Sequence, residues 1–64
     1  MKISKLTAKR ILKDSGAERV SDSAATELAD LITSFSYSVA NKAVRLAGHA
    51  RRKTVSKADI ELAK

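Results

Sequence analysis

Basic side chains are the residues of this sequence best placed to do chemistry. Thirteen Lys and Arg stand against seven Asp and Glu, which gives the 64 residues a formal net charge of +6. The excess is local, with +4 on residues 1–20 and +3 on residues 49–64, against −1 on residues 21–48. Such a charge on a small surface favours polyanions, meaning nucleic acid or an anionic membrane surface. The cations that we single out are Arg10, Lys13, Arg19, Lys53 and Lys57.

Other kinds of chemistry lack the residues they need. The sequence has no Cys, so it forms neither a disulfide nor a zinc finger, and its single His, His49, cannot build a metal cage alone. No nucleophile–base set and no phosphate-binding glycine loop is present. With only Phe35 and Tyr37 as aromatic residues, a base-stacking surface for RNA or single strands is disfavoured. We therefore expect no enzyme, no cofactor and no metal site.

The expected compartment follows from what the sequence does not contain. Its apolar runs are far too short to span a bilayer, and no apolar segment typical of a secretory signal follows Met1. The absence of Cys is compatible with a reducing interior. We expect a soluble, cytoplasmic protein with no membrane partner, which leaves nucleic acid as the favoured polyanion.

Helices must position the cations, since the chain has no Pro, only two Gly and no long alternation at period two. A first helix is expected over about residues 4–14, with a narrow apolar stripe. It should stop at Gly16, because Gly adopts the left-handed cap conformation without a Cβ clash. A third helix should begin at Ser56, with Asp59 three residues later as a near capping box, and run to Lys64.

A long central helix is predicted between two loops. Ser21 can cap it, Asp22 places negative charge in its first turn, and apolar residues then recur at helical spacing as far as Gly48. We expect about 28 residues, or about 42 Å at 1.5 Å per residue. Gly48 is expected to be tolerated inside the last turn.

A helix of this length predicts a dimer. A compact monomer of this size would have a radius of gyration of about 11 Å, which such a helix overshoots. Two short flanking helices also cannot cover its apolar face. A second copy should cover the remainder, most simply in a two-fold dimer with crossed central helices. The residues expected in the dimer core are Leu28, Leu31, Ile32, Phe35 and Val39.

Three stretches of the sequence, in order and at the expected separations, resemble archaeal histones. Residues 13–21 (KDSGAERVS) are similar to the first loop of that family, residues 46–55 (LAGHARRKTV) to the second loop and its lead-in, and residues 58–63 (ADIELA) to the last helix. The resemblance implies an all-α histone fold over residues 1–64, as a single domain that forms a handshake dimer. Ser56 departs from it, since this position is often basic in the family.

The resemblance also implies a function, which is the bending, wrapping and compaction of double-stranded DNA without sequence specificity. Dimers would lie on the chromosome and associate side by side, into tetramers or longer DNA-wrapped fibres, and a heterodimer with a related histone stays open. The competing hypothesis is a histone-fold adaptor in a transcription or repair assembly. An adaptor would be expected to lose the loop residues Arg19, Lys53 and Thr54, which this sequence keeps.

The resemblance places one residue of each loop at the DNA. Arg19 and Thr54 would form a pair, since the first loop of one protomer lies beside the second loop of the other. A guanidinium suits the narrow, electronegative minor groove, and a hydroxyl fixes its orientation. Lys53 and Lys57 flank the second loop and the start of the third helix, where free amides also attract phosphate.

Two cations of the first helix complete the expected DNA surface. Arg10 resembles the family arginine that enters the minor groove near the dimer axis, and Lys13 would lie one turn away, near phosphates. The alternative for both residues is a solvated helix face that contacts nothing.

Two further roles come from the resemblance. Arg52 and Asp59 would pair and tie the second loop to the third helix. Leu46, His49 and Asp59 would form the contact between neighbouring dimers. The alternative for His49 is a surface residue at a helix end, where a protonated imidazole is favoured by the helix dipole.

Overall fold

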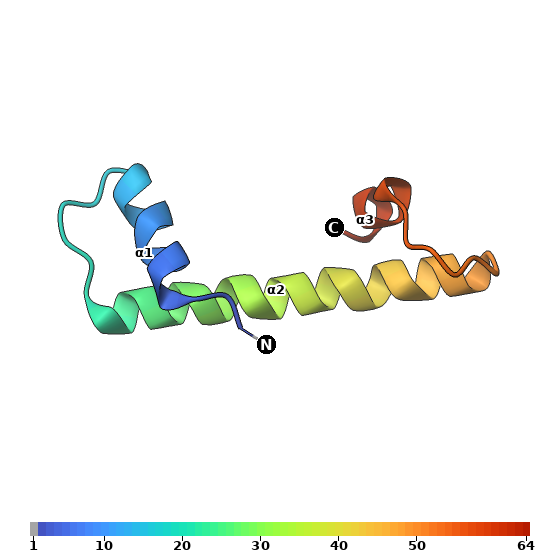
Figure 1. Cartoon of the computed structure of the whole chain (residues 1–64), viewed down its shortest axis with the longest axis horizontal. Helices are drawn as coiled ribbons and strands as arrows, with labels where there is room; N and C mark the ends of the chain where they lie inside the picture. The colour runs from blue at the N-terminus through green and yellow to red at the C-terminus, as the bar shows by residue number, and fades with distance from the viewer. Residues whose placement is uncertain (1) are drawn as a thin grey trace. The chain divides into compact units, whose positions relative to one another are not determined.

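The computed structural model describes residues 2–64, which form three helices and no strand. Helix α1 spans Lys5–Asp14, α2 spans Asp22–His49 and α3 spans Lys57–Ala63 (Figure 1). The predicted order of a short, a long and a short helix is confirmed, and so is the length of the central helix, at 28 residues.

The chain divides into two compact units, and the boundary between them falls within α2. The first covers Met1–Ser34 and contains α1 with the first part of α2. The second covers Phe35–Lys64 and contains the rest of α2 with α3. That residues 1–64 form a single domain stays a prediction.

Local hydrogen bonds set both ends of α1. The Ser4 hydroxyl accepts a bond from the Thr7 amide at 3.1 Å and so caps the helix start. At the other end Gly16 has a φ of +112°, and its N–H and that of the next residue close the two hydrogen bonds of a Schellman motif. This motif needs a residue in the left-handed region, for which Gly is the least strained choice. The helix therefore ends where the sequence predicts.

Small side chains form the interior of the first unit. The buried apolar residues there are Ala8 of α1 with Ala25 and Ala29 of α2. Alanine lets helix backbones approach closely, but it buries little apolar area, so the unit gains little hydrophobic stabilisation from them.

Polar contacts fasten the N-terminal residues to α2. The Ile3 amide donates to Thr33 Oγ1 at 2.9 Å, and the ammonium of Lys5 lies 3.1 Å from the carboxylate of Asp22. The Lys5 pair is largely exposed, and such surface ion pairs contribute about 0–1 kcal/mol. These contacts orient α1 and leave the other α1 cations available.

The start of α2 and the glycine near its end also follow the sequence. The Ser21 hydroxyl accepts a bond from the Ala24 amide at 3.0 Å, as expected of a capping residue. Gly48 lies inside the last turn of α2. A Cβ added at Gly48 would meet no atom within 4 Å, so no close packing requires a glycine there.

The end of α2 repeats the motif that ends α1, with a different residue at its centre. Arg51 has a φ of +57°, in the left-handed region. Its amide donates to the Gly48 carbonyl at 3.0 Å, and the Arg52 amide donates to the Ala47 carbonyl at 2.9 Å. These are the two bonds of a Schellman motif, in which Arg51 occupies the position that Gly16 has after α1.

The second unit is also built on small residues. Its buried residues are Ala43 and Ala47 of α2 with Asp59 and Ala63 of α3. At the start of α3 the carboxylate of Asp59 accepts a bond from the Ser56 amide at 2.8 Å, which is the acidic half of the predicted capping box.

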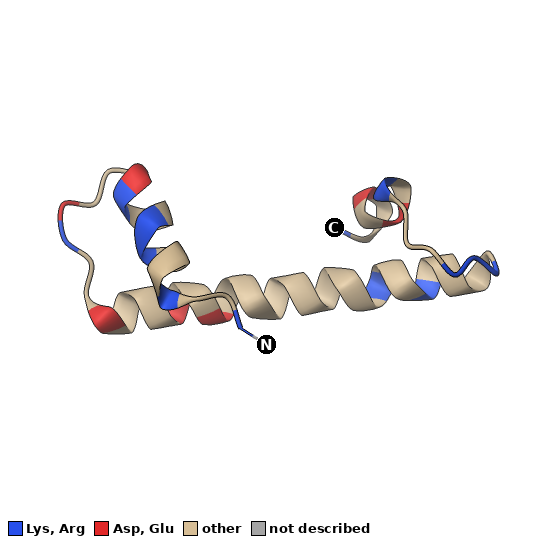
Figure 2. Ribbon diagram, viewed as in Figure 1, with Lys and Arg blue, Asp and Glu red and all other residues tan. Residues whose placement is uncertain are grey.

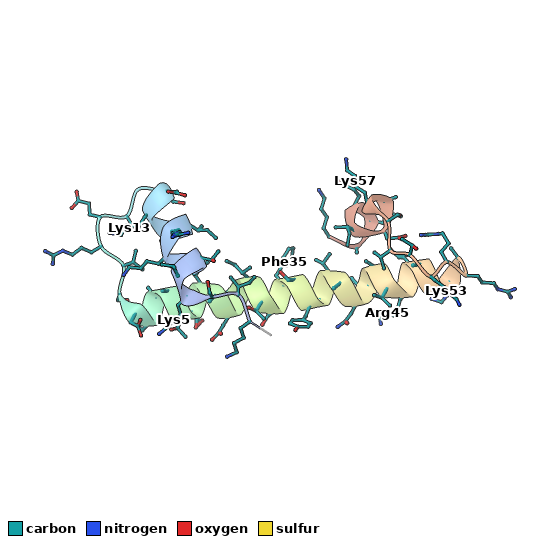
Figure 3. The ribbon with its side chains drawn as sticks, in the orientation of Figure 1. Lys5, Lys13, Phe35, Arg45, Lys53 and Lys57 are labelled. Atoms are coloured by element: carbon teal, nitrogen blue, oxygen red, sulfur yellow. The ribbon has the colours of Figure 1, made fainter. Side chains whose placement is uncertain are left out.

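Among residues 2–64, every buried apolar side chain is an alanine, and many large apolar side chains are exposed. Of the residues expected in the dimer core, Leu28, Ile32 and Val39 are half-buried, whereas Leu31 and Phe35 are 60% and 64% exposed. Phe35 projects from the middle of α2 (Figure 3). A soluble protein rarely leaves so much apolar surface in water, so these side chains require a further surface to pack against.

Candidate nucleic-acid interface

Exposed cations follow α1, because its buried stripe is narrow. Lys9, Arg10 and Lys13 are all exposed, whereas Ala8 is fully buried. The ammonium of Lys13 donates to the Glu18 carbonyl at 2.7 Å, which holds it beside the first loop. Figure 2 shows these blue segments on α1 and the acidic residues at the start of α2. The charge therefore lies on α1 and its loop, as the sequence indicates.

Arg19 lies in the first loop, five residues after the end of α1. It is exposed and forms no hydrogen bond or ion pair with the described residues. Its guanidinium is therefore free to bind an external group. Thr54 lies in the other unit, and the expected pair joins two different protomers.

An ion pair shapes the second loop. The guanidinium of Arg52 donates to both carboxylate oxygens of Asp59, at 2.9 and 2.8 Å, and also to the Thr54 carbonyl at 3.2 Å. The amide and hydroxyl of Ser56 donate to the same carboxylate at 2.8 and 3.1 Å. The structure thus brings Arg52 and Asp59 together as expected, and Asp59 is only 3% exposed. The bidentate geometry fixes the loop to the start of α3.

The same contacts set the protonation of the pair. The guanidinium of Arg52, followed by the Ser56 amide, holds the pKa of the Asp59 carboxyl well below its usual range. The Asp59 carboxylate in turn raises the pKa of Arg52. Both groups are charged at neutral pH and neutralise each other. Arg52 therefore adds little to the net field of the loop.

The remaining basic residues of this region point outward. Lys53 and Lys57 are exposed (Figure 3), and so are Thr54 and Arg51. The Ser56 amide at the start of α3 is already bonded to Asp59, so Lys57 must attract phosphate mainly by its own charge. Sequence reasoning missed Arg51, because the left-handed turn that presents it is a property of the backbone.

The residues expected between dimers are only partly together. Leu46 and His49 line one open groove of about 450 Å³, and Asp59 is not among its lining residues. Sequence reasoning missed four of the six lining residues, although Lys42 and Arg45 share a helix face with Leu46 and His49. The missed residues are Lys42, Arg45, Leu62 and Ala63.

Metal-binding clusters and membrane-spanning helices are both absent from residues 2–64. These residues contain no group of three or more His, Asp or Glu that could hold a metal ion. None of their helices is long and apolar enough to cross a membrane.

A long helix between two short ones, with exposed cations on α1 and in both loops, defines a helical protein with a polyanion-binding surface. Residues 1–63 match the family described as histone-like transcription factor (CBF/NF-Y) and archaeal histone. The chain therefore belongs to this family, and its fold is the histone fold.

Two curated relatives support the archaeal branch of the family. The chain is 44% identical to one of the subunits of the archaeal histone HAN1 of Thermococcus zilligii over 54 residues, which are 84% of this chain and 81% of the relative. The chain is also 44% identical over 54 residues to probable archaeal histone 3 of Methanocaldococcus jannaschii, with the same coverage of both chains.

Proposed function

We propose that this protein is an architectural histone, which binds double-stranded DNA as a handshake dimer and bends and compacts it. The family and both curated relatives support a structural DNA-binding protein rather than an enzyme. The observation that carries the proposal is that large apolar side chains and unpaired cations are both exposed on the same chain. The parts of the chain that leave apolar surface exposed need a partner, and the cations need a polyanion.

The dimer follows from burial. Because alanines are the only apolar residues that are buried among residues 2–64, one chain by itself buries too little apolar area to offset its conformational entropy. A second copy packed along α2 would cover Leu31 and Phe35, which lie four residues apart on one helix face. Folding and dimerisation should therefore be one event.

The DNA surface follows from the free cations. Arg10, Arg19 and Lys53 are exposed and make no ion pair with residues 2–64, so their charges are available to phosphates and to the minor groove. Contacts of this kind carry little sequence information, so DNA deformability should set any preference. The adaptor alternative is not favoured, because Arg19, Lys53 and Thr54 are all present and exposed.

Assembly beyond the dimer is a finer part of the proposal. Dimers would associate through a surface that includes Leu46 and His49, giving tetramers or longer fibres on DNA in the nucleoid. Asp59 would support this surface indirectly, since its carboxylate is bonded to Arg52 and Ser56. Pairing with a related histone in place of a second copy is compatible with the same surfaces.

Two measurements test the proposal directly. Sedimentation without DNA should give a folded dimer, and a stable folded monomer would contradict the shared core. Ligation of short linear duplexes into circles should be accelerated by the protein, because a bent duplex brings its ends together. Binding without any increase in circle formation would remove the architectural role and favour the adaptor.

A further inference from the structure

Arg51 occupies a backbone position that suits glycine better than arginine. Its φ is +57°, and among the residues that the structure describes it is the only non-glycine residue with a positive φ. Glycine reaches this left-handed region without a Cβ clash. The sequence has a glycine three residues earlier, but Gly48 lies inside α2, where a Cβ would meet no atom within 4 Å. Gly48 in the helix and Arg51 in the turn are thus each the less stable choice for their position.

The helix dipole explains only part of this arrangement. The last carbonyls of a helix carry partial negative charge, and a cation placed just after them is favourable. The strain of a non-glycine residue in the left-handed region exceeds that gain. Strained backbone of this kind occurs preferentially at functional sites, where the side chain has a further task. The strained turn therefore indicates that the Arg51 side chain binds something outside the chain.

Arg51 and Lys53 carry the charge that the second loop can offer to a ligand. The guanidinium of Arg52, which lies between them, donates to both carboxylate oxygens of Asp59 and is neutralised. Arg51 and Lys53 are both exposed, and neither forms an ion pair within residues 2–64 (Figure 2). The amides of Arg51 and Arg52 donate back to carbonyls of α2, at 3.0 and 2.9 Å. An anion at this turn must therefore be bound by side chains and not by the backbone.

We propose that Arg51 is a DNA contact of this protein and binds a backbone phosphate next to the one that Lys53 binds. The inference rests on the proposed architectural function, because it adds a residue to the same surface. Two residues of chain span at most about 7 Å, and one strand of a duplex carries a phosphate per about 3.4 Å of helix axis. The two long side chains can therefore reach neighbouring phosphates of one strand. Arg51 also reduces the repulsion between such a phosphate and the carbonyl end of α2.

Arg51→Gly tests this contact without endangering the fold, since glycine is the least strained residue for the turn. Binding to a duplex of fixed length is measured against salt concentration. The slope of log K against log salt should be smaller by about two per dimer, because each lost phosphate contact is worth about 0.9. The affinity advantage of wild type should then shrink about tenfold between about 50 and 200 mM salt. Arg51→Lys keeps the charge in the same turn and should keep the wild-type slope.

Two controls separate a positioned contact from net charge. Lys64→Ala makes the same charge change at a cation already paired with Glu61, and it should leave the slope unchanged. The exchange variant, Gly48→Arg with Arg51→Gly, keeps the net charge but moves the cation three residues, into the last turn of α2. Both positions are exposed, and the helix and the turn each receive the more stable residue. The slope of the exchange variant should equal that of Arg51→Gly.

Four results would overturn the inference. They are an unchanged slope for Arg51→Gly, a reduced slope for Arg51→Lys, an equal reduction for Lys64→Ala, and a wild-type slope for the exchange variant. None of them bears on whether wild type bends DNA, which is measured separately by circle formation. Wild type that binds the duplex without accelerating circle formation would instead overturn the proposed function.

Discussion

Arg51 offers the sharpest test of how the second loop is built. A non-glycine residue in the left-handed region costs about 1–2 kcal/mol, and Arg51 has a φ of +57°. Glycine removes that strain but loses about 0.5–1 kcal/mol more backbone entropy on folding. The backbone contributions alone therefore favour Arg51→Gly by about 0.5–1 kcal/mol per chain.

The charge of Arg51 must be separated from its conformation. A cation after the end of α2 interacts favourably with the helix dipole by about 0.3–1 kcal/mol, and both Gly and Ala remove it. Arg51→Ala keeps the strain, so the difference between the Gly and Ala variants isolates the backbone. That difference should be about 1 kcal/mol, or about 4–8 °C in Tm for a domain of this size. The protein concentration must be held constant, since the Tm of a dimer depends on it.

The two native glycines calibrate the comparison. Gly48 lies within α2 and a Cβ there meets nothing within 4 Å, so Gly48→Ala should stabilise by about 1 kcal/mol. Gly16 has a φ of +112°, so Gly16→Ala should destabilise by a similar amount, about 1 kcal/mol or more. If Arg51→Gly melts at or below Arg51→Ala while the glycine variants behave as described, the strain at Arg51 is refuted.

The remaining predictions concern DNA, the core and acid. Lys53→Ala should lower the slope of log K against log salt by about two per dimer, because each lost phosphate contact is worth about 0.9; a salt titration checks it. Arg19→Ala should reduce bending and flatten any preference for A·T-rich over G·C-rich duplexes, measured by circle formation on both. Phe35→Asp should abolish the helical circular-dichroism signal and the dimer together, because the core is shared. In acid, the contribution of Asp59 to stability is complete above the unfolded pKa of about 3.9 and is lost as the pH falls toward the lower folded pKa. The Tm of wild type should therefore drop as the pH falls below about 3.9, and the Tm of Asp59→Asn should drop less.

Each of these predictions has a matched control or a refuting result. Lys64→Ala removes an exposed cation that is paired with Glu61, and it should leave the salt slope unchanged. Equal losses on both duplexes with bending intact would reduce Arg19 to a phosphate contact. Ser36→Asp adds the same charge beside Phe35 at an exposed position and should leave the dimer folded. A Tm of Asp59→Asn as acid-sensitive as that of wild type would assign the effect to other carboxyl groups.

The helices could be predicted because their boundaries depend on interactions within a few residues. Ser21 and Gly16 act within one turn of themselves, through a side-chain hydroxyl and a backbone conformation, so their positions in the sequence suffice. The groove was not predictable in the same way. It is lined by residues of both α2 and α3, such as Arg45 and Leu62, and the sequence alone does not give the packing of α3 on α2.

Arg51 shows a second limit of sequence reasoning. A glycine at this position would have predicted a left-handed turn, as Gly16 does after α1. The glycine of this region is instead Gly48, which lies three residues earlier and inside the helix. The turn forms at Arg51 because the Gly48 and Ala47 carbonyls still need donors at the end of α2. The exposed charge of Arg51 in a strained turn could therefore not be predicted before the backbone conformation was known.

The pair of Arg52 and Asp59 decides which charges of the second loop can act. Because Arg52 is neutralised by a buried carboxylate, the loop reaches its shape before any ligand is bound, with Thr54 and Ser56 fixed by the same contacts. Lys53 is then presented from a preorganised loop, and less conformational entropy is lost when it meets a phosphate. The apolar surface has the opposite character, since Phe35 is 64% exposed. The second loop is thus ordered within one chain, whereas the apolar core needs a second chain to cover it. Dimer formation should therefore precede DNA binding.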